Sequence, residues 1–386
     1  MNDHEASALK LIFREGQINQ LTVQNRVIRS ATHDGKADNN GMVTNQQIES
    51  YEKLAKGGVG LIISGIASVH PDGAINPHQL DISSDKCIEG LRRLVKAVHK
   101  YDTKIAVQLC HAGRESARHL SGVGLRALAP SLLKNDPHFK LKYKEINSEK
   151  IDEIINSFTK SAKRAISIGF DAVQIHGAHA FLISQFLSPF TNRRNDIWGG
   201  NLKNRFRLLE KIYTAIRQEV GTEYPLMIKL GVEDGFPEGL KLKEGLVYAK
   251  WCEQIGFDAI EVSQGLRGTY FEQTEFRTGI DNFHKEGYFR AYSKGVKKAV
   301  DIPVIMVGGL RSPILMERLL KGNEADYVSL CRPFIRQPNL VKLWRENGPS
   351  VAECISCNAC YTNLREKGLP LRCVFEVDNE REKNDN

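Results

Sequence analysis

The stretch Ser167-Ile-Gly-Phe-Asp-Ala-Val-Gln-Ile-His176 is nearly repeated as Gln254-Ile-Gly-Phe-Asp-Ala-Ile-Glu-Val-Ser263. Weaker copies are Lys56-Gly-Gly-Val-Gly-Leu-Ile-Ile-Ser64 and Gly322-Asn-Glu-Ala-Asp-Tyr-Val-Ser-Leu330. Each copy has the end of a helix, a glycine that stops it and a short strand rich in β-branched residues. The repeat therefore predicts strands that alternate with helices.

Eight such units can be followed along the chain. Strands are expected near 27–31, 60–64, 104–108, 172–176, 226–230, 259–263, 303–307 and 327–331. Helices are expected near 45–56, 86–100, 148–168, 201–220, 241–255, 289–300, 312–321 and 338–346. Since strand–helix alternation joins parallel strands by right-handed crossovers, eight units predict an α/β fold of the closed (β/α)8 TIM-barrel type. An open doubly wound sheet is the alternative.

The expected helix 148–168 shows the pattern most clearly. Ile151, Phe158 and Ile166 fall on one face at helical spacing, and Ser148 is the expected N-cap.

The chain divides into three expected parts. Residues 1–348 form the barrel, 349–376 a cysteine-rich extension packed on it, and 377–386 a solvated tail. Long loops follow strands three, four and six, at 109–147, 177–200 and 264–288. Loops after strands line the catalytic face of a barrel, so this length predicts a built-up pocket.

The composition excludes several classes of protein. The 386 residues are 41% hydrophobic and 26% charged, which excludes a disordered, collagen-like or coiled-coil chain. The net charge of +8 is unclustered, so it indicates neither a nucleic-acid nor a membrane partner but is compatible with an anionic ligand. No signal pattern and no apolar run of roughly 18 residues is found, and the expected location is cytoplasmic.

Polar residues gather where the expected strands end. Together with the small residues between them, the candidate site positions are Ser30, Ala31, Thr32, His33, Gly65, Gln108, His176, His179, Lys229, Gly308, Gly309 and Arg332. In a barrel, strand ends face the active site. Gly308, Gly309 and Arg332 follow strands seven and eight, where barrels often bind phosphate.

The remaining strand-end residues suggest three kinds of contact. His176 and His179 suit hydrogen-bond donation to an oxyanion, or else a metal. Lys229 requires a nearby anion, and Gln108 suits the amide edge of a heterocycle. An aldolase or isomerase that uses Lys229 as a Schiff-base nucleophile is a further alternative.

At these residues the chain resembles the old yellow enzyme family, in its NADH:flavin oxidoreductase and 2,4-dienoyl-CoA reductase-like branch. The resemblance covers about residues 9–376. Its main motif runs from His176-Gly-Ala-His through Leu-Ser-Pro189 to Asn192-Arg193-Arg194, Gly200 and Asn204-Arg205. Gln108-Leu-Cys-His-Ala-Gly-Arg114 and Val307-Gly-Gly-Leu-Arg311 support it.

The resemblance implies a barrel that binds FMN over its strand ends and uses NADH or NADPH. Ser30, Ala31 and Thr32 would pass beside the flavin, Gly65 would leave room for the ring, and Gln108 would pair with its pyrimidine edge. Lys229 would lie near N1 and O2, and Gly308, Gly309 and Arg332 would hold the phosphate. His176 and His179 would bind the oxygen of an activated alkene, an enone or enoyl compound, for hydride transfer from N5.

Three further positions concern the substrate. The family's proton-donating tyrosine is replaced by Phe181, which cannot donate a proton. Tyr270 is a candidate substitute or an ordinary loop aromatic. His33 resembles a histidine of the dienoyl-CoA reductase branch, where it would face the flavin or serve in packing.

The extension contains Cys354, Cys357, Cys360 and Cys373. Their spacing resembles that of a 4Fe–4S iron–sulfur cluster in larger relatives, with one residue fewer between the second and third cysteines. Structural zinc and metal-free thiols are the alternatives.

The sequence therefore predicts an NAD(P)H-dependent flavin oxidoreductase acting on a small molecule, with an anionic or CoA-linked one permitted. The alternative is an FMN/iron–sulfur electron-transfer module with a partner protein. A homo-oligomer is also compatible with the sequence.

Overall fold

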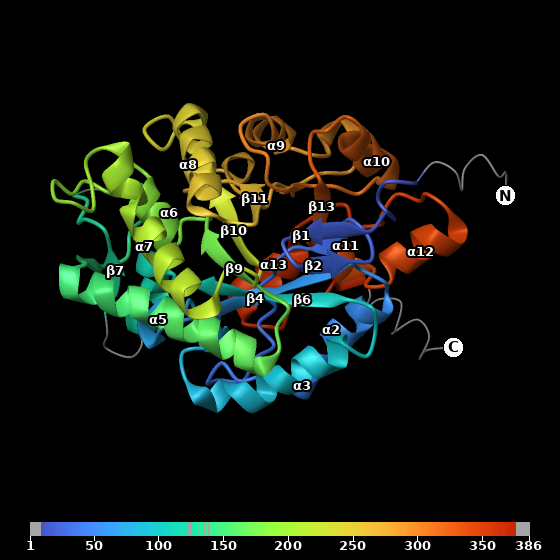
Figure 1. The fold of residues 1–386 in the computed structure, drawn as a ribbon, viewed down its shortest axis with the longest axis horizontal. Coiled ribbons are helices and arrows are strands. Elements are labelled where there is room, and N and C mark those ends of the chain that lie inside the picture. The colour runs from blue at the N-terminus through green and yellow to red at the C-terminus, as the bar shows by residue number, and fades with distance from the viewer. Residues whose placement is uncertain (1–8, 122–125, 135, 138, 376–386) are drawn as a thin grey trace.

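Eight parallel strands close into a ring in the computed structural model, which describes residues 9–121, 126–134, 136–137 and 139–375 (Figure 1). They are β3 (Val27–Arg29), β4 (Leu61–Ser68), β6 (Lys104–Cys110), β9 (Ala172–Gly177), β10 (Leu226–Gly231), β11 (Ala259–Ser263), β12 (Val304–Met306) and β13 (Tyr327–Leu330). Each pairs in parallel with its neighbour, and β3 pairs with both β13 and β4 to close the ring. The predicted TIM barrel is confirmed, and the open sheet is excluded. A short strand, β5 (Leu80–Asp81), adds to β4.

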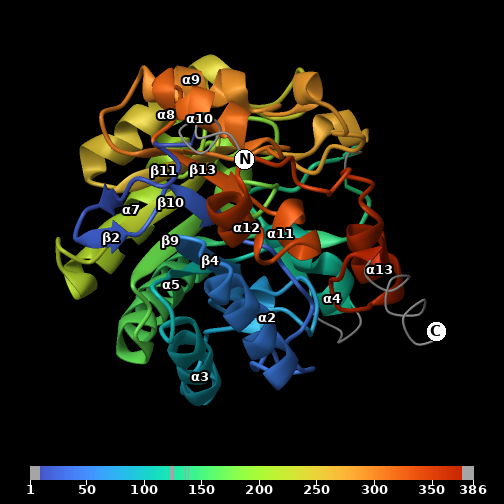
Figure 2. The ribbon, with the colours of Figure 1, turned by 90° about the vertical axis from the view of Figure 1, so that its right-hand side faces the viewer.

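Helices surround this ring in both views (Figures 1 and 2). They are α2 (Asn45–Lys56), α3 (Ile88–Val98), α5 (Ser148–Ile168), α7 (Leu202–Val220), α8 (Leu242–Ile255), α9 (Arg290–Lys297), α10 (Pro313–Lys321) and α12 (Leu340–Asn347). Each overlaps a predicted helix.

Helix α5 corrects two details of the prediction. Its N-cap is Asn147, whose side chain accepts a hydrogen bond from the backbone N–H of Lys150 at 3.0 Å. Ser148 is already helical, because the amide oxygen of Asn147 satisfies that first-turn donor. Ile151 is fully buried as predicted, whereas Ile166 is 38% exposed and lies outside the buried stripe.

A hairpin covers the N-terminal end of the barrel. Strands β1 (Gly16–Ile18) and β2 (Leu21–Val23) pair antiparallel, and their Ile18, Leu21 and Val23 pack against barrel residues including Ile28 and Met227. Burial of these side chains away from water stabilises this end. Only the opposite, C-terminal ends of the strands remain for a ligand site.

Shorter elements build the C-terminal face. They comprise α4 (Ala117–Ser121), α6 (Leu182–Leu187), α11 (Arg332–Arg336), α13 (Ala359–Lys367), the paired strands β7 (Ala127–Ala129) and β8 (Tyr143–Glu145), and 3-10 turns at Pro71–Gly73, Asp85–Cys87, Gly113–Ser116, Phe271–Gln273 and Phe283–Lys285. Apart from the turn at Asp85–Cys87 and helix α13 of the extension, each belongs to one of the three long loops or to a segment that directly follows a barrel strand.

The described part of the cysteine-rich extension is bound to the barrel by backbone hydrogen bonds. Ala352 donates to the carbonyl of Arg311, and Leu371 donates to that of Asp34 at 2.8 Å. The predicted tail 377–386 lies outside the described residues.

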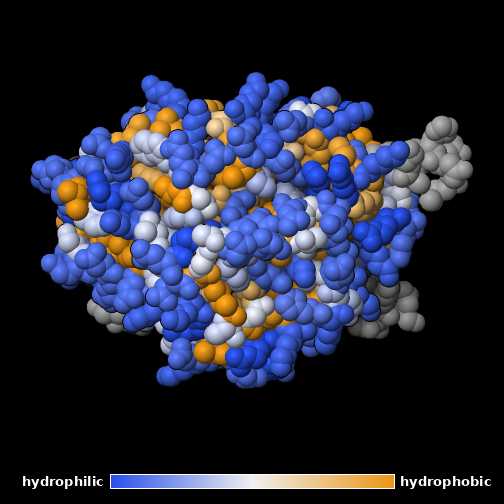
Figure 3. All heavy atoms as spheres, in the orientation of Figure 1, coloured by the Kyte–Doolittle hydropathy of each residue, from blue (hydrophilic) through white to orange (hydrophobic). Residues whose placement is uncertain are grey.

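The surface in Figure 3 is mainly hydrophilic, with apolar residues in small separate groups. Of the helices that the structure describes, none combines the length and the apolar character needed to cross a bilayer.

Candidate active site

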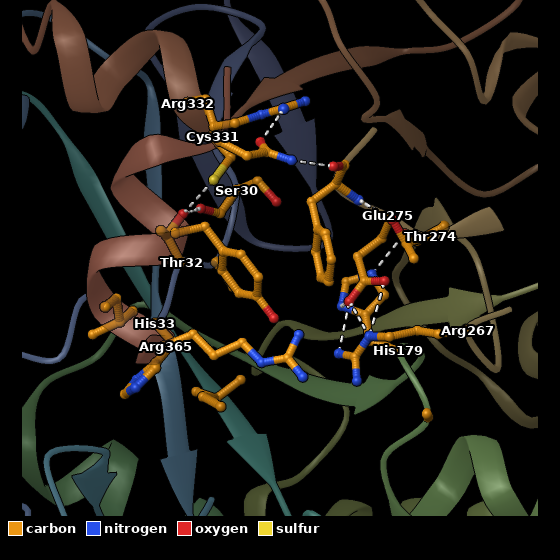
Figure 4. Close-up of a pocket in the computed structure, with 18 of the residues that line it drawn as sticks. Ser30, Thr32, His33, His179, Arg267, Thr274, Glu275, Cys331, Arg332 and Arg365 are labelled. Atoms are coloured by element: carbon orange, nitrogen blue, oxygen red, sulfur yellow. Dashed lines mark hydrogen bonds and ion pairs between the residues drawn. The ribbon is translucent and has the colours of Figure 1, made fainter. Parts of the chain in front are cut away.

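A cavity of about 1020 Å³ opens at the C-terminal ends of the barrel strands. It lies at the upper end of the size range of small-molecule sites. Most of the predicted site residues line it: Ser30, Ala31, Thr32, His33, Gln108, His176, His179, Phe181, Lys229, Tyr270, Gly308, Gly309, Arg332 and Cys360. Gly65, Cys354, Cys357 and Cys373 do not. Figure 4 shows Arg332 and Cys331 at the top of this cavity, Arg267 and His179 at its right, and Arg365 at its lower left.

The backbone after β12 is shaped for close approach. Gly309 has a φ of +70°, and a Cβ at this position would lie 2.7 Å from Cε1 of Tyr288. A side chain is therefore excluded both by conformation and by space.

Two arginines lie beside these glycines. Arg332 donates hydrogen bonds to the carbonyl of Arg277 at 2.7 Å and to Oδ1 of Asn358 at 2.6 Å. The buried Nε of Arg311 has no partner among the described residues. Guanidinium groups next to exposed backbone suit a phosphate.

Lys229 lies at the base of the cavity and is almost completely buried. Its Nζ is 3.1 Å from Oε1 of Glu261 and donates to Oγ of Ser30 at 2.8 Å. Glu261 satisfies the sequence-based expectation that Lys229 needs an anion. This pairing with a carboxylate argues against the aldolase or isomerase alternative, because a Schiff-base nucleophile requires a neutral amine.

Two amides connect Glu261 to Gln108. Nε2 of Gln174 donates to Oε2 of Glu261 at 3.0 Å, and Nε2 of Gln108 donates to Oε1 of Gln174 at 2.6 Å. No hydrogen bond to Oε1 of Gln108 is formed within the described part of the chain, so this acceptor is left for a ligand.

The rings of His176 and His179 meet edge to face, with centroids 5.0 Å apart. The Nε2 of His179 is 2.8 Å from Oγ of Ser263. The buried Nδ1 of His176 has no partner among the described residues. Nε2 of His176 forms no hydrogen bond with the described residues either, and because His176 lines the cavity, Nε2 is the nitrogen left for a ligand.

Burial is the main cause that lowers the pKa of both imidazoles well below 6.5. The nearby charges of Lys229 and Arg267 lower both pKa values further, and His179 also lowers the pKa of His176. Both rings are therefore neutral at neutral pH, in the form that can donate one hydrogen bond without carrying charge.

The backbone that carries His179 is in an unfavourable conformation. His179 and Ala180 have φ values of 59° and 62°, in the left-handed region that few non-glycine residues adopt. Their N–H groups donate to the carbonyls of Gln264 and Gly265 at 3.0 Å, which holds the turn in place. Such strain is typical of functional sites.

Phe181, His33 and Tyr270 line the cavity in different ways. Phe181 is buried and meets the ring of His176 edge to face at 4.9 Å. His33 Nε2 is 2.9 Å from Nδ2 of Asn76, and burial lowers its pKa. Tyr270 is 68% exposed at the rim, where its hydroxyl is far more solvated than a buried acid.

A charged cluster that the sequence did not predict lies beside the histidines. Arg267 pairs with Glu275 at 2.7 Å and with Glu115 at 3.3 Å, and it lies over the ring of Phe181. Arg365 of α13 points its guanidinium toward this cluster in Figure 4 and forms no hydrogen bond or short ion pair with the described residues. Burial raises the pKa of Glu115, and the charge of Arg365 acts against that effect at longer range.

Gly65 packs closely against the segment that follows β3, and its predicted role beside the flavin stays a prediction. A Cβ at Gly65 would lie 2.9 Å from the carbonyl oxygen of Thr32, and its N–H donates to the hydroxyl of Tyr51 at 2.8 Å. In this structure glycine is needed so that β4 can approach the segment after β3.

The four cysteines of the extension are free thiols. Cys357 is exposed, and Cys354, Cys360 and Cys373 are partly buried. Among the described residues, no group of three or more His, Cys, Asp or Glu side chains is placed to hold a metal ion. The residues as arranged therefore do not fit an iron–sulfur cluster or zinc, and binding of either stays a prediction.

FMN, by contrast, fits the residues present. An open amide acceptor at Gln108, a buried cation at Lys229, a glycine turn with two arginines and the imidazole of His176 all line one cavity. Each matches a different part of a phosphorylated heterocycle bound against a second, oxygen-bearing molecule.

Comparison with known proteins agrees with this arrangement. The family model described as "NADH:flavin oxidoreductase / NADH oxidase family" matches residues 12–349. An NADH oxidase of Thermoanaerobacter brockii is 35% identical over 94% of this chain, which spans 55% of that relative. An NADPH dehydrogenase of Bacillus cytotoxicus is 33% identical over 85% of this chain and 90% of its own length.

Among solved structures, a 2-naphthoyl-CoA reductase in complex with 2-naphthoyl-CoA superimposes with a TM-score of 0.87 at 27% identity. The match covers 94% of this chain and 56% of that one. The chain thus spans about half the length of this neighbour and of the NADH oxidase, and nearly the whole of the NADPH dehydrogenase. It belongs to the NADH:flavin oxidoreductase / NADH oxidase family, the old yellow enzyme family that its motifs resemble.

Proposed function

We propose that this chain binds FMN and catalyses reduction of an activated alkene, an enone or enoyl compound, or a similar acceptor, at the expense of NADH or NADPH. The observation that carries the proposal is the neutral pair His176 and His179, held in the same cavity as Gln108 and Lys229. FMN supplies the hydride when it is bound.

The two imidazoles would bind and polarise the acceptor. Nε2 of His176, which forms no hydrogen bond with the described residues, is suited to donate one to a carbonyl oxygen in the cavity. Ser263 fixes the ring of His179, and Phe181 packs against His176, so neither imidazole has to reorganise when the oxygen gains charge. This preorganisation lowers the barrier at the carbon that is conjugated with the carbonyl.

Arg365 supports an anionic acceptor. Arg267 is shared between Glu275 and Glu115, and Lys229 pairs with Glu261, whereas Arg365 lines the cavity with no ion pair within 4.0 Å among the described residues. A carboxylate or phosphate on the acceptor would fill that role. The CoA thioester named with the 2-naphthoyl-CoA reductase is consistent with an acceptor of this class.

The test is an anaerobic half-reaction experiment. The purified protein is expected to contain FMN, to be bleached by NADH or NADPH, and to be reoxidised by 2-cyclohexen-1-one. The double variant His176→Asn/His179→Asn should be reoxidised at least about 100-fold more slowly, since removing oxyanion donors costs about that much. His284→Asn is the matched control, because His284 is exposed and outside the cavity.

Two results would refute the proposal: protein without flavin after gentle purification, or reoxidation by the enone at the same rate in the double variant. Iron and acid-labile sulfide measured in the same preparation decide separately whether the four thiols hold a cluster.

A further inference from the structure

We propose that Glu261 is a positioning residue, whose carboxylate fixes, through Gln174, which end of the Gln108 amide faces the cavity. This arrangement presents an acceptor to the imide N–H of the flavin's pyrimidine edge. The inference rests on the proposed FMN site and concerns how the chain prepares it.

Glu261 is the fixed point because an ionised carboxylate only accepts hydrogen bonds. Oε1 accepts from Ser30 at 2.8 Å and from Ser329 at 2.7 Å, and it is paired with Lys229. Oε2 is left for Gln174. Burial alone would raise the pKa of Glu261, but Lys229, both serines and Gln174 outweigh it and hold the pKa below its usual value.

The polarity of both amides follows from that charge. Gln174 must turn its NH2 group toward Oε2 of Glu261, so its carbonyl oxygen faces Gln108. Gln108 must then turn its own NH2 group toward Gln174, as the 2.6 Å contact requires. Its Oε1 is thereby left for the ligand, together with one remaining N–H.

The barrel makes this chain of contacts rigid. Gln108 and Gln174 are register partners across β6 and β9, and Lys229 and Glu261 are register partners across β10 and β11. Gln174 and Glu261 are fully buried, so water does not compete for their hydrogen bonds. Gln174 lies two residues before His176 on β9, and Glu261 lies two residues before Ser263 on β11. Residues two apart on a strand point to the same face, so Gln174 and Glu261 share the face that carries His176 and Ser263.

Neutralising Glu261 should therefore reverse the amides. In Glu261→Gln, the side-chain oxygen remains toward Lys229 and the serines, and the NH2 group faces Gln174. Gln174 has to turn its carbonyl toward this new donor, and Gln108 then turns its NH2 group toward the cavity. The acceptor for an imide N–H is lost without any change at Gln108 itself.

The double variant Glu261→Gln/Gln174→Glu separates orientation from charge at position 261. A carboxylate at 174 accepts from the amide at 261 and from Nε2 of Gln108, which restores the original direction of Gln108. A third variant, Gln174→Met, keeps the volume and the Lys229–Glu261 pair but removes the connection.

The experiment measures dissociation constants of the apoproteins for FMN and for 3-methyl-FMN, which lacks the imide N–H. The wild type is expected to prefer FMN. Glu261→Gln should bind FMN at least about 10-fold more weakly and lose most of the preference, since an acceptor has been exchanged for a donor. The double variant should recover the preference to within about threefold, and Gln174→Met should lose it.

The outcomes are distinct. If the wild type binds FMN and both Glu261→Gln and Gln174→Met keep the full preference, the positioning role is refuted while the proposed function stands. If Glu261→Gln does not fold, Gln174→Met alone decides in the same way. If the wild type binds no FMN, both proposals fail.

Discussion

The imidazole of His176 meets that of His179 at 82° and 5.0 Å, and burial keeps both rings uncharged. This relationship makes stability depend on pH. The unfolded chain binds protons at these residues near pH 6.5, whereas the folded chain does not, so stability is lost as pH falls below that value.

Each imidazole should contribute up to about 1.4 kcal/mol per pH unit to that loss. Urea unfolding at pH 7.5 and 5.5 measures it, and His176→Asn/His179→Asn should have a shallower slope. Part of the slope should persist, because burial also lowers the pKa of His33, and that of His111 to about 3. An unchanged slope in the double variant would mean that these rings already carry a proton when folded.

Phe181 stands at the position where the resemblance to the old yellow enzyme family implies a proton-donating tyrosine, and its phenyl ring cannot donate a proton. It is buried against His176, so Phe181→Tyr would place a phenol in the cavity. If protonation of the acceptor limits the reaction, reoxidation of the reduced enzyme by 2-cyclohexen-1-one should become faster, by up to about 100-fold. Stopped-flow absorbance measures this rate. Phe190→Tyr, outside the cavity, is the control, and an equal rate in both variants would show that protonation is not limiting.

Arg365 should matter for charged acceptors only. Arg365→Gln is expected to raise KM about 10-fold for an enone that carries a carboxylate and to leave KM for 2-cyclohexen-1-one unchanged. Lys367→Gln is the matched control, because Lys367 lies on the same helix but does not line the cavity. Equal effects on both acceptors would indicate that Arg365 maintains the packing of α13 instead.

Gly309→Ala should impair both stability and cofactor binding. The substitution adds backbone strain of about 1 kcal/mol and drives the new Cβ against the ring of Tyr288, which a hydrogen bond to Glu275 holds in place. Gly279→Ala is the control, since Gly279 also has a positive φ but has open space around it. Thermal unfolding and FMN titration should show a larger loss of stability and of FMN affinity in Gly309→Ala than in Gly279→Ala. Equal losses in the two variants would mean that backbone strain is the only effect.

The sequence predicted the barrel because the repeated glycine–strand phrase reports directly on local structure. It also located most cavity residues, since a residue that ends a parallel strand must face the catalytic side. The same reasoning missed Gln174 and Glu261, which lie inside strands rather than at their ends. A signal was nevertheless present, because both occupy the same position in the two copies of the phrase.

Other features depend on contacts between distant segments. Gly65 faces the carbonyl of Thr32 across two strands, and Arg365 reaches the cavity from a helix outside the repeat. Neither follows from local periodicity. The N-cap of α5 is Asn147, one residue before the predicted Ser148. Both are good capping residues, and only the backbone conformation distinguishes them.

The seam between β3 and β13 has a consequence for biosynthesis. Val27 is a register partner of Val328, and Leu371 donates to Asp34, so the ring and the wall of its cavity both need the last part of the chain. A nascent chain on the ribosome has an open strand edge at β3 until that part emerges, and open edges invite aggregation. The ring and this wall of the cavity can therefore be complete only after the segment through Leu371 has left the ribosome.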